Sequence, residues 1–185
     1  MALTITNKES LKQIFDKVNR VYYFETAGAA LADQTKCLEL PVLEDGVTFD
    51  TGEAEVNEVK LTDRTTWVSK ANQGDSDISF QVSSVHNTIN DLLMEKKTSA
   101  AMSGDFDGMT YTGDGYSLAP KKVTGALLMQ SEDKTTAIYL PNVEIFASFN
   151  GEGGDDSTGY YNVQVTPLTD ENGAAFYPMQ GTPKL

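Results

Sequence analysis

The chain contains very few of the residues on which enzymes usually build an active site. Its 185 residues include one histidine, one cysteine and one tryptophan, which are His86, Cys37 and Trp67. A single cysteine excludes an intramolecular disulfide and a zinc site built from several cysteines. The chain also has no glycine-rich phosphate loop of the GxGxxG or Walker type. We therefore predict that the protein is not an enzyme and has no catalytic, cofactor-binding or metal-binding residues.

Positive charge and long apolar runs are also scarce. The chain has 14 Lys and Arg against 27 Asp and Glu, a formal net charge of -13, whereas surfaces that grip nucleic acid neutralise phosphates with Lys and Arg. The longest apolar runs, such as residues 29–32 and 126–129, are far too short to span a membrane. Residues 1–11 lack the basic segment and apolar core of a secretory signal. We expect a soluble, cytoplasmic protein that binds neither nucleic acid nor a membrane.

The lone histidine and the lone cysteine are the first residues to consider for catalysis. His86 lies at the edge of the apolar stripe of an expected helix, near Leu93 on the helical wheel, so a packing or capping role explains it better than catalysis. Cys37 and His86 could be drawn as nucleophile and base. Nothing in the sequence brings the two together, and a buried, inert cysteine is the more usual case.

Two groups of acidic residues are candidate cation sites. Asp105 and Asp107 precede Gly108 as at the start of a calcium loop, but Met109 stands where the pattern needs an oxygen ligand. The second acidic group consists of Glu152, Asp155 and Asp156. It could hold a cation weakly, although solvated loop charge is the simpler interpretation.

Residues 75–97 combine a strand pattern with a helix pattern. Ile78, Phe80 and Val82 alternate with polar residues, which predicts a half-buried strand. Apolar or long side chains then recur at helical spacing at Val85, Ile89, Leu92, Leu93 and Lys96. This predicts an amphipathic helix over residues 85–97 with Ser83 or Ser84 as its N-cap, followed by a small polar run over residues 98–103.

The remaining segments read mostly as short strands and turns. A short helix is predicted over residues 8–19. Strands are predicted over residues 20–25, 37–42, 109–118, 121–130, 135–140, 143–149 and 160–167. Residues 47–61 are predicted as a long polar hairpin, and residues 62–73 as an arm-like loop that docks on another surface through Trp67. Pro141 and Asn142 are predicted to end the strand at 135–140. Loops are expected at residues 26–33, 104–108 and 150–158, and a tail at residues 168–185. The predicted fold is a single mainly β domain over residues 1–185, an antiparallel β-sandwich or small barrel flanked by one central helix.

The order of these elements resembles that of the tail tube proteins (major tail proteins) of long-tailed bacteriophages. The features that carry the resemblance are the polar hairpin at 47–61, the arm at 62–73, Gly74 and Asp75 before the strand at 78–80, the single helix, and a turn at residues 140–143. The resemblance covers residues 37–167. It implies a β-sandwich or small barrel with one helix, a fold shared with the tube of type VI secretion systems.

The resemblance also implies a function without catalysis. Six copies would form a ring, rings would stack through the loop around Trp67, and DNA would pass through the tube without specific binding. Other tail proteins would be partners, and the protein would be cytoplasmic during assembly and then part of the virion tail. The acidity of the chain fits a lumen that must not bind DNA.

Two other functions remain open. The first is a β-sandwich module that binds a carbohydrate or small ligand, whose stacking surfaces would come from Tyr22, Tyr23, Trp67, Tyr160 and Tyr161. The second is a metal-free hydrolase, for which the sequence offers no triad.

Overall fold

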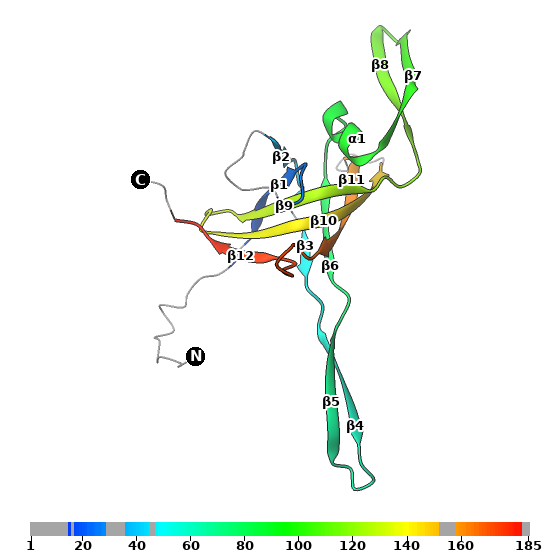
Figure 1. The fold of residues 1–185 in the computed structure, drawn as a ribbon. Coiled ribbons are helices and arrows are strands. Elements are labelled where there is room, and N and C mark those ends of the chain that lie inside the picture. The colour runs from blue at the N-terminus through cyan, green and yellow to red at the C-terminus, as the bar shows by residue number, and fades with distance from the viewer. Residues whose placement is uncertain (1–14, 16, 29–35, 45–46, 152–157, 183–185) are drawn as a thin grey trace. The chain divides into compact units, whose positions relative to one another are not determined.

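The structure is a computed structural model that describes Phe15 and residues 17–28, 36–44, 47–151 and 158–182. Its described residues form twelve strands in antiparallel sheets and one short helix (Figure 1). This confirms the predicted class, a mainly β, sandwich-like fold with a single helix.

The contacts within the chain divide it into two compact units. Unit 1 comprises Met1–Val42, Thr124–Glu144 and Pro167–Leu185, and unit 2 comprises Leu43–Val123 and Ile145–Thr166. Strand β10 contributes its first part to unit 1 and its second part to unit 2. Each unit is described by itself below.

Unit 1 is built on antiparallel strands in the order β2-β1-β9-β10, with β12 also paired to β10. Its strands are β1 (Val18–Phe24), β2 (Cys37–Leu40), β9 (Val123–Ser131), the first part of β10 (Thr136–Asn150) and β12 (Tyr177–Gln180). Val21 pairs with Met129 and Tyr23 with Leu127, so these four buried side chains share one face. Strand β2 lies at the edge of this sheet, and Pro41, which follows it, has no N–H to donate to a further strand.

The sheet of unit 2 continues from β10 in the order β10-β11-β6-β3. Its strands are β3 (Thr48–Asp50), β6 (Asp77–Val82) and β11 (Tyr160–Leu168). The predicted alternation is confirmed here, because Ile78, Phe80 and Val82 are buried and Phe80 pairs with the buried Val163. Burial of these branched and aromatic side chains is the main stabilising term of the unit.

Helix α1 (Asn87–Leu93) is shorter than the predicted helix over residues 85–97. Its N-cap is His86 rather than Ser83 or Ser84, and Val85 is exposed. Glu95, Lys96 and Lys97 begin strand β7 (Glu95–Phe106), so the two lysines do not lie in a last helical turn. Pairing of this segment with β8 (Met109–Ser117) outweighs its helical pattern.

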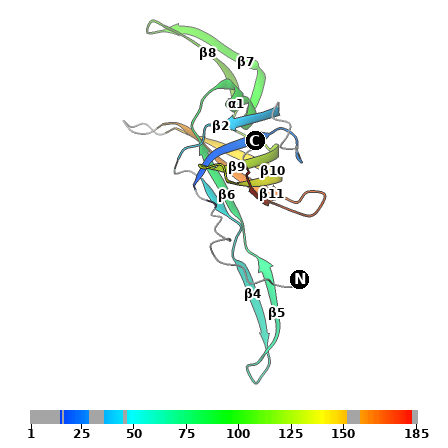
Figure 2. The same cartoon turned by 90° about the vertical axis from the view of Figure 1, so that its left-hand side faces the viewer.

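Two further hairpins belong to unit 2. Strand β4 (Ala54–Lys60) pairs with β5 (Thr66–Gln73), and β7 pairs with β8; Figures 1 and 2 show both as two-stranded ribbons. The predicted loop at 62–73 is thus mostly strand. The predicted hairpin at 47–61 is wrong in its pairing, because β3 pairs with β6 and β4 pairs with β5. The polar run at 98–103 lies within β7, and so do residues 104–106 of the loop expected at 104–108.

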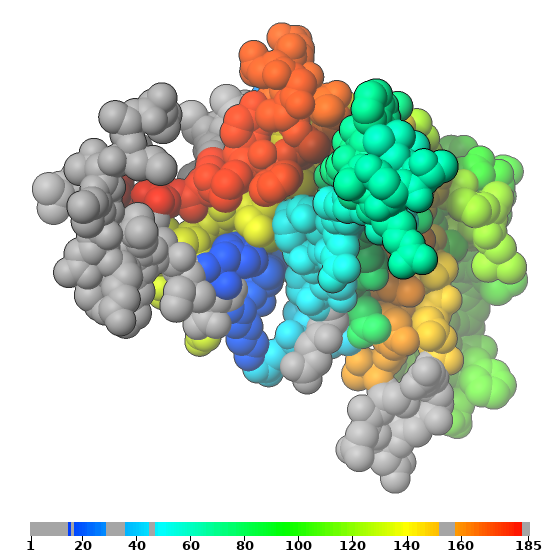
Figure 3. Space-filling view, turned by 90° about the horizontal axis from the view of Figure 1, so that it is seen from below, coloured from blue at the N-terminus to red at the C-terminus, as the bar shows by residue number. Residues whose placement is uncertain are grey.

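Three predictions about the ends and breaks of the chain are also corrected. Strand β10 runs through Pro141 and Asn142 without a break, so the turn at 140–143 used in the resemblance is absent. The segment after residue 168 is not a free tail, because β12 pairs with β10 from Tyr177 to Gln180; Figure 3 shows this segment in red beside β10 in yellow. The helix predicted over 8–19 is wrong at its end, since β1 begins at Val18, and residues 8–14 and 16 lie outside the described residues.

Candidate functional site

His86 has a structural role at the start of α1. Its ring nitrogen Nδ1 accepts a hydrogen bond from the backbone N–H of Thr88 at 3.2 Å. This satisfies one of the N–H groups that a helix leaves unpaired in its first turn. The capping role expected from the sequence is confirmed, and the lone pair that a general base would use is already occupied.

Cys37 lies at the start of the edge strand β2 and is half-buried. Burial, with a smaller contribution from Glu39, raises the pKa of its thiol above the ordinary value of 9.0. A raised pKa lowers the fraction of thiolate, which is the nucleophilic form. The environment of Cys37 therefore does not activate it.

The acidic candidates do not assemble a metal site in the described part of the chain. Asp107 and Gly108 have φ angles of 50° and 77° and form the tight turn between β7 and β8. Asp105 accepts a hydrogen bond from the Thr110 hydroxyl at 2.7 Å. Among the described residues, no cluster of three or more His, Cys, Asp or Glu side chains could hold a metal ion. Glu152, Asp155 and Asp156 lie outside the described residues.

The β4–β5 hairpin is a ribbon whose strand residues are all exposed. Large apolar side chains lie on it nonetheless: Val56, Val59, Leu61, Trp67 and Val68, with Trp67 at 69% exposure. The register places Val59 opposite Val68 on one face and Val56 opposite Ala71 on the other. Apolar side chains therefore occur on both faces. In Figure 3 the tip of the hairpin, in blue-green, faces the viewer.

The base of this hairpin is a close crossing of two backbone segments. A Cβ on Gly52, whose φ is 80°, would lie 2.5 Å from the carbonyl oxygen of Asp75. A Cβ on Gly74 would lie 2.4 Å from the carbonyl oxygen of Glu53, and the N–H of Gly74 donates to that oxygen at 3.0 Å. Only glycine fits at these two positions, so the crossing fixes where the ribbon leaves the sheet.

The β7–β8 hairpin has one apolar and one polar face. Met102, Phe106, Met109 and Tyr111 are all exposed, Met102 at 82% and Phe106 at 75%. Its register pairs Met102 with Gly113, Gly104 with Tyr111 and Phe106 with Met109, which places these six residues on one face. The opposite face carries the polar pairs Ser103 with Thr112 and Asp105 with Thr110. We call the face that carries Met102, Gly104, Phe106, Met109, Tyr111 and Gly113 the apolar face of β7–β8.

A cluster of charged and polar groups joins the base of β7–β8 to α1. The Tyr116 hydroxyl donates to Asp91 at 2.6 Å, and Lys96 binds Asp114 at 2.6 Å and Asp91 at 3.7 Å. The hydrogen bond to the Asp91 carboxylate is the main reason that the pKa of Tyr116 rises to about 12. Lys121 donates to the backbone carbonyl of Asp91 at 2.6 Å. These contacts hold the start of the hairpin against the helix.

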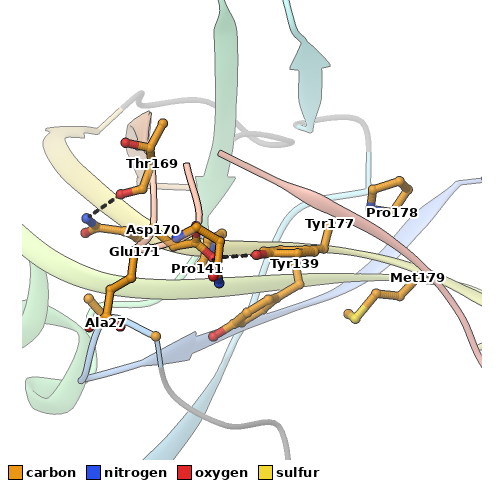
Figure 4. A pocket seen from close by; sticks show the side chains of 12 residues that line it. Ala27, Tyr139, Pro141, Thr169, Asp170, Glu171, Tyr177, Pro178 and Met179 are labelled. Carbon is orange, nitrogen blue, oxygen red and sulfur yellow. Dashed lines mark hydrogen bonds between the residues drawn. The ribbon is translucent and has the colours of Figure 1, made fainter. Parts of the chain in front are cut away.

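Unit 1 contains a cavity of about 920 Å³ next to β10 and β12 (Figure 4). Tyr139 and Tyr177 line it, with ring centroids 6.4 Å apart, and Pro141 forms part of its wall. This volume is within the range of small-molecule sites. The aromatic lining makes the cavity the best candidate in unit 1 for a ligand-binding module.

Several polar groups of this cavity are already engaged within the protein. Asp170 accepts hydrogen bonds from the backbone N–H groups of Asn172 at 2.8 Å and Ala174 at 2.9 Å, and from the Tyr177 hydroxyl. The Tyr177 hydrogen bond is the main cause of the lowered pKa of Asp170. The side-chain amide of Asn142 donates to the carbonyl of Thr169. Figure 4 marks the bond to the carbonyl of Thr169 and the bond between Tyr177 and Asp170 with dashed lines. Together with the two backbone bonds to Asp170, they organise the loop before β12.

The five aromatic residues proposed for ligand stacking have different environments. Tyr23 and Tyr161 are buried, and their hydroxyls bond to the carbonyl of Thr124 and to Asn90 at 2.9 and 2.7 Å. Trp67 is exposed on β5. Tyr22 lines a second hollow of unit 1, and Tyr160 accepts a hydrogen bond from Asn150 at 3.0 Å. Two of the five are therefore core residues and unavailable for stacking.

Sequence inspection missed the apolar face of β7–β8, where Met102, Phe106, Met109 and Tyr111 are all exposed. A signal for it exists in the Asp107-Gly108 pair, a common two-residue hairpin turn. Met102, Gly104 and Phe106 before this turn, and Met109, Tyr111 and Gly113 after it, alternate with polar residues. Together these features predict a hairpin with one apolar face.

No known protein family, curated protein or solved structure matches this chain. The one helix in the described residues is too short to cross a membrane.

Proposed function

We propose that the protein is a structural subunit of a phage or prophage tail tube, which assembles with copies of itself into stacked hexameric rings. The observation that carries this proposal is the pair of exposed hairpins in unit 2. A two-stranded hairpin without a covering layer is marginally stable in water. Strands that expose several large apolar side chains are therefore expected to be covered by another protein surface.

The chemistry of the described residues also supports a structural role. His86 caps a helix, the thiol pKa of Cys37 is raised, and the carboxylate of Asp170 is held by its own loop. None of these groups is poised for catalysis. The net charge of -13 suits a conduit that lets DNA slide past, because phosphates gain no counterion release from an acidic wall.

The test is the mass and shape of the purified full-length chain over a wide concentration range. Sedimentation velocity should show a species of about six times the 20.1 kDa subunit mass, and negative-stain electron microscopy should show sixfold rings or stacked tubes. Fluorescence anisotropy with labelled duplex DNA should show no binding at physiological salt. A constant mass of one subunit at every concentration would contradict the proposal and turn attention to the cavity of unit 1.

A further inference from the structure

Gly104 and Gly113 on the apolar face of β7–β8 are not explained by the fold of the chain itself. Neither has a positive φ, and a Cβ added to either would meet no atom within 4 Å. Any residue could therefore adopt the same backbone there. Glycine inside a strand weakens the strand, and it often marks a place where another backbone or a ligand approaches closely.

Gly104 and Gly113 both line a hollow in this hairpin. This hollow has a volume of about 800 Å³ and is lined by residues 100–106 and 111–115. Met102, Phe106 and Tyr111 stand around the glycines and expose most of their surface. The face is thus shaped to receive a protruding apolar surface, and the described residues leave it uncovered.

Charge favours one partner for this face. Residues 101–114 contain Asp105, Asp107 and Asp114 and no Lys or Arg. The β4–β5 hairpin, in contrast, is electrically balanced in a strongly acidic chain, with three acidic and three basic residues between residues 54 and 73. Its Arg64 and Lys70 form no ion pair with any described residue. It is therefore a part of the chain that an acidic hairpin can approach without repulsion.

The order of the chain places the two hairpins at the two ends of β6. Hairpin β4–β5 joins β6 at Asp77, and α1 and then β7–β8 follow Val82. Two different uncovered surfaces on one chain can meet between copies in a head-to-tail contact, which repeats into a closed ring or an open helix. We propose that the apolar face of β7–β8 binds the β4–β5 hairpin of a second copy of this chain. This inference rests on the proposed self-assembly and names the surfaces that carry it.

A glycine replacement separates the contact between copies from the fold of one copy. Gly113→Val fills the hollow without a clash inside the chain, whereas Thr112→Val places a valine on the opposite, polar face with almost no change in side-chain volume. Both variants should keep the far-ultraviolet circular dichroism and urea midpoint of the wild type. The concentration needed for assembly should rise about tenfold or more for Gly113→Val and should stay near the wild-type value for Thr112→Val.

Cross-linking identifies the partner surface directly. In a Cys37→Ser background, a chain with Met102→Cys is mixed with a chain that carries Val56→Cys or Val68→Cys, one on each face of β4–β5. Oxidation of assembled material should give a disulfide-linked dimer between the two kinds of chain for at least one of these positions. Dimers only between Met102→Cys chains, or none, would overturn the hairpin pairing.

The outcomes distinguish this inference from the proposed function. Assembly of the wild type with unchanged assembly of Gly113→Val would overturn the inference alone and indicate that a different protein covers the apolar face. Failure of the wild type to assemble at any concentration would overturn both.

Discussion

Helix α1 is the element whose stability can be tested most sharply, because two adjacent leucines in it differ in burial. Leu93 is 3% exposed, whereas Leu92 is only half-buried. A helix of seven residues is too short to be stable alone in water, so buried contacts must hold it in place. Truncation of Leu93 should therefore cost much more stability than truncation of its neighbour.

The expected cost follows from the atoms removed. Leu93→Ala removes three carbon atoms, worth about 0.8 kcal/mol each when buried, and leaves a cavity that raises the total to about 3–4 kcal/mol. Leu92→Ala should cost about 1 kcal/mol, because that side chain retains water contact in the folded state. With a urea m-value of about 2 kcal/mol per M, Leu93→Ala should lower the midpoint by about 1.5–2 M.

Far-ultraviolet circular dichroism in urea is the appropriate assay, at a protein concentration below that of assembly. Fluorescence of the only tryptophan would be a poor reporter, because Trp67 is exposed on β5 and not in contact with the core. Equal losses in the two variants, or a loss below about 1 kcal/mol for Leu93→Ala, would refute the view that Leu93 anchors the helix.

Three further predictions concern single contacts. His86→Ala should cost about 1 kcal/mol in urea unfolding and His86→Asp almost nothing, because aspartate also caps helices; equal losses would contradict the capping role. The hydrogen bond from the Ser131 hydroxyl is the main cause of the lowered pKa of Asp133. Ionised Asp133 therefore stabilises the fold above the ordinary carboxyl pKa of 3.8, and this stabilisation is lost as pH falls through the lower pKa of the folded state. The stability of Asp133→Asn in urea unfolding should depend less on pH in the acid range. Asp91→Asn should lower the pKa of Tyr116 from about 12 towards 10, as measured by the ultraviolet absorbance of tyrosinate, and an unchanged titration would contradict the assigned hydrogen bond.

The strands that form the core could be predicted from the sequence, because they combine burial with alternation. Phe80 on β6 and Val163 on β11 have polar neighbours along the chain and pair with each other in the sheet. In such strands one face must leave water, so the register that the sequence pattern predicts is also the register that buries the apolar side chains. The predicted strands at 78–82 and 160–167 are confirmed for this reason.

The β4–β5 hairpin could not be predicted in the same way, because it buries neither of its faces within the chain. On β4 and β5 apolar and polar residues are mixed on both faces. The alternation of apolar and polar residues along each strand therefore does not indicate which strands pair. The turn between them contains no glycine and uses Arg64 at a φ of 68°, which is uncommon for that residue type. No local feature of the sequence therefore predicts that β4 pairs with β5 rather than with β3.

The length of the helix was misjudged because a lysine was counted in its apolar stripe. The aliphatic part of Lys96 can extend such a stripe, but its ammonium group binds Asp114 on β8. Strand pairing from Glu95 onwards gives backbone partners that a further helical turn would have removed. Pro141 misled in a similar way, because proline is usually excluded from strands and yet lies buried within β10.

The net charge of the chain determines how the proposed contact should respond to salt. Two copies that each carry -13 repel one another, and this repulsion extends about 10 Å at 0.1 M salt and about 3 Å at 1 M. A contact dominated by Met102, Phe106 and Tyr111 loses little in salt, because apolar burial is not screened. Added sodium chloride should therefore lower the concentration needed for assembly, as measured by sedimentation velocity. The opposite trend would mean that ion pairs of residues such as Lys70 hold the copies together, and that apolar burial on β7–β8 is secondary.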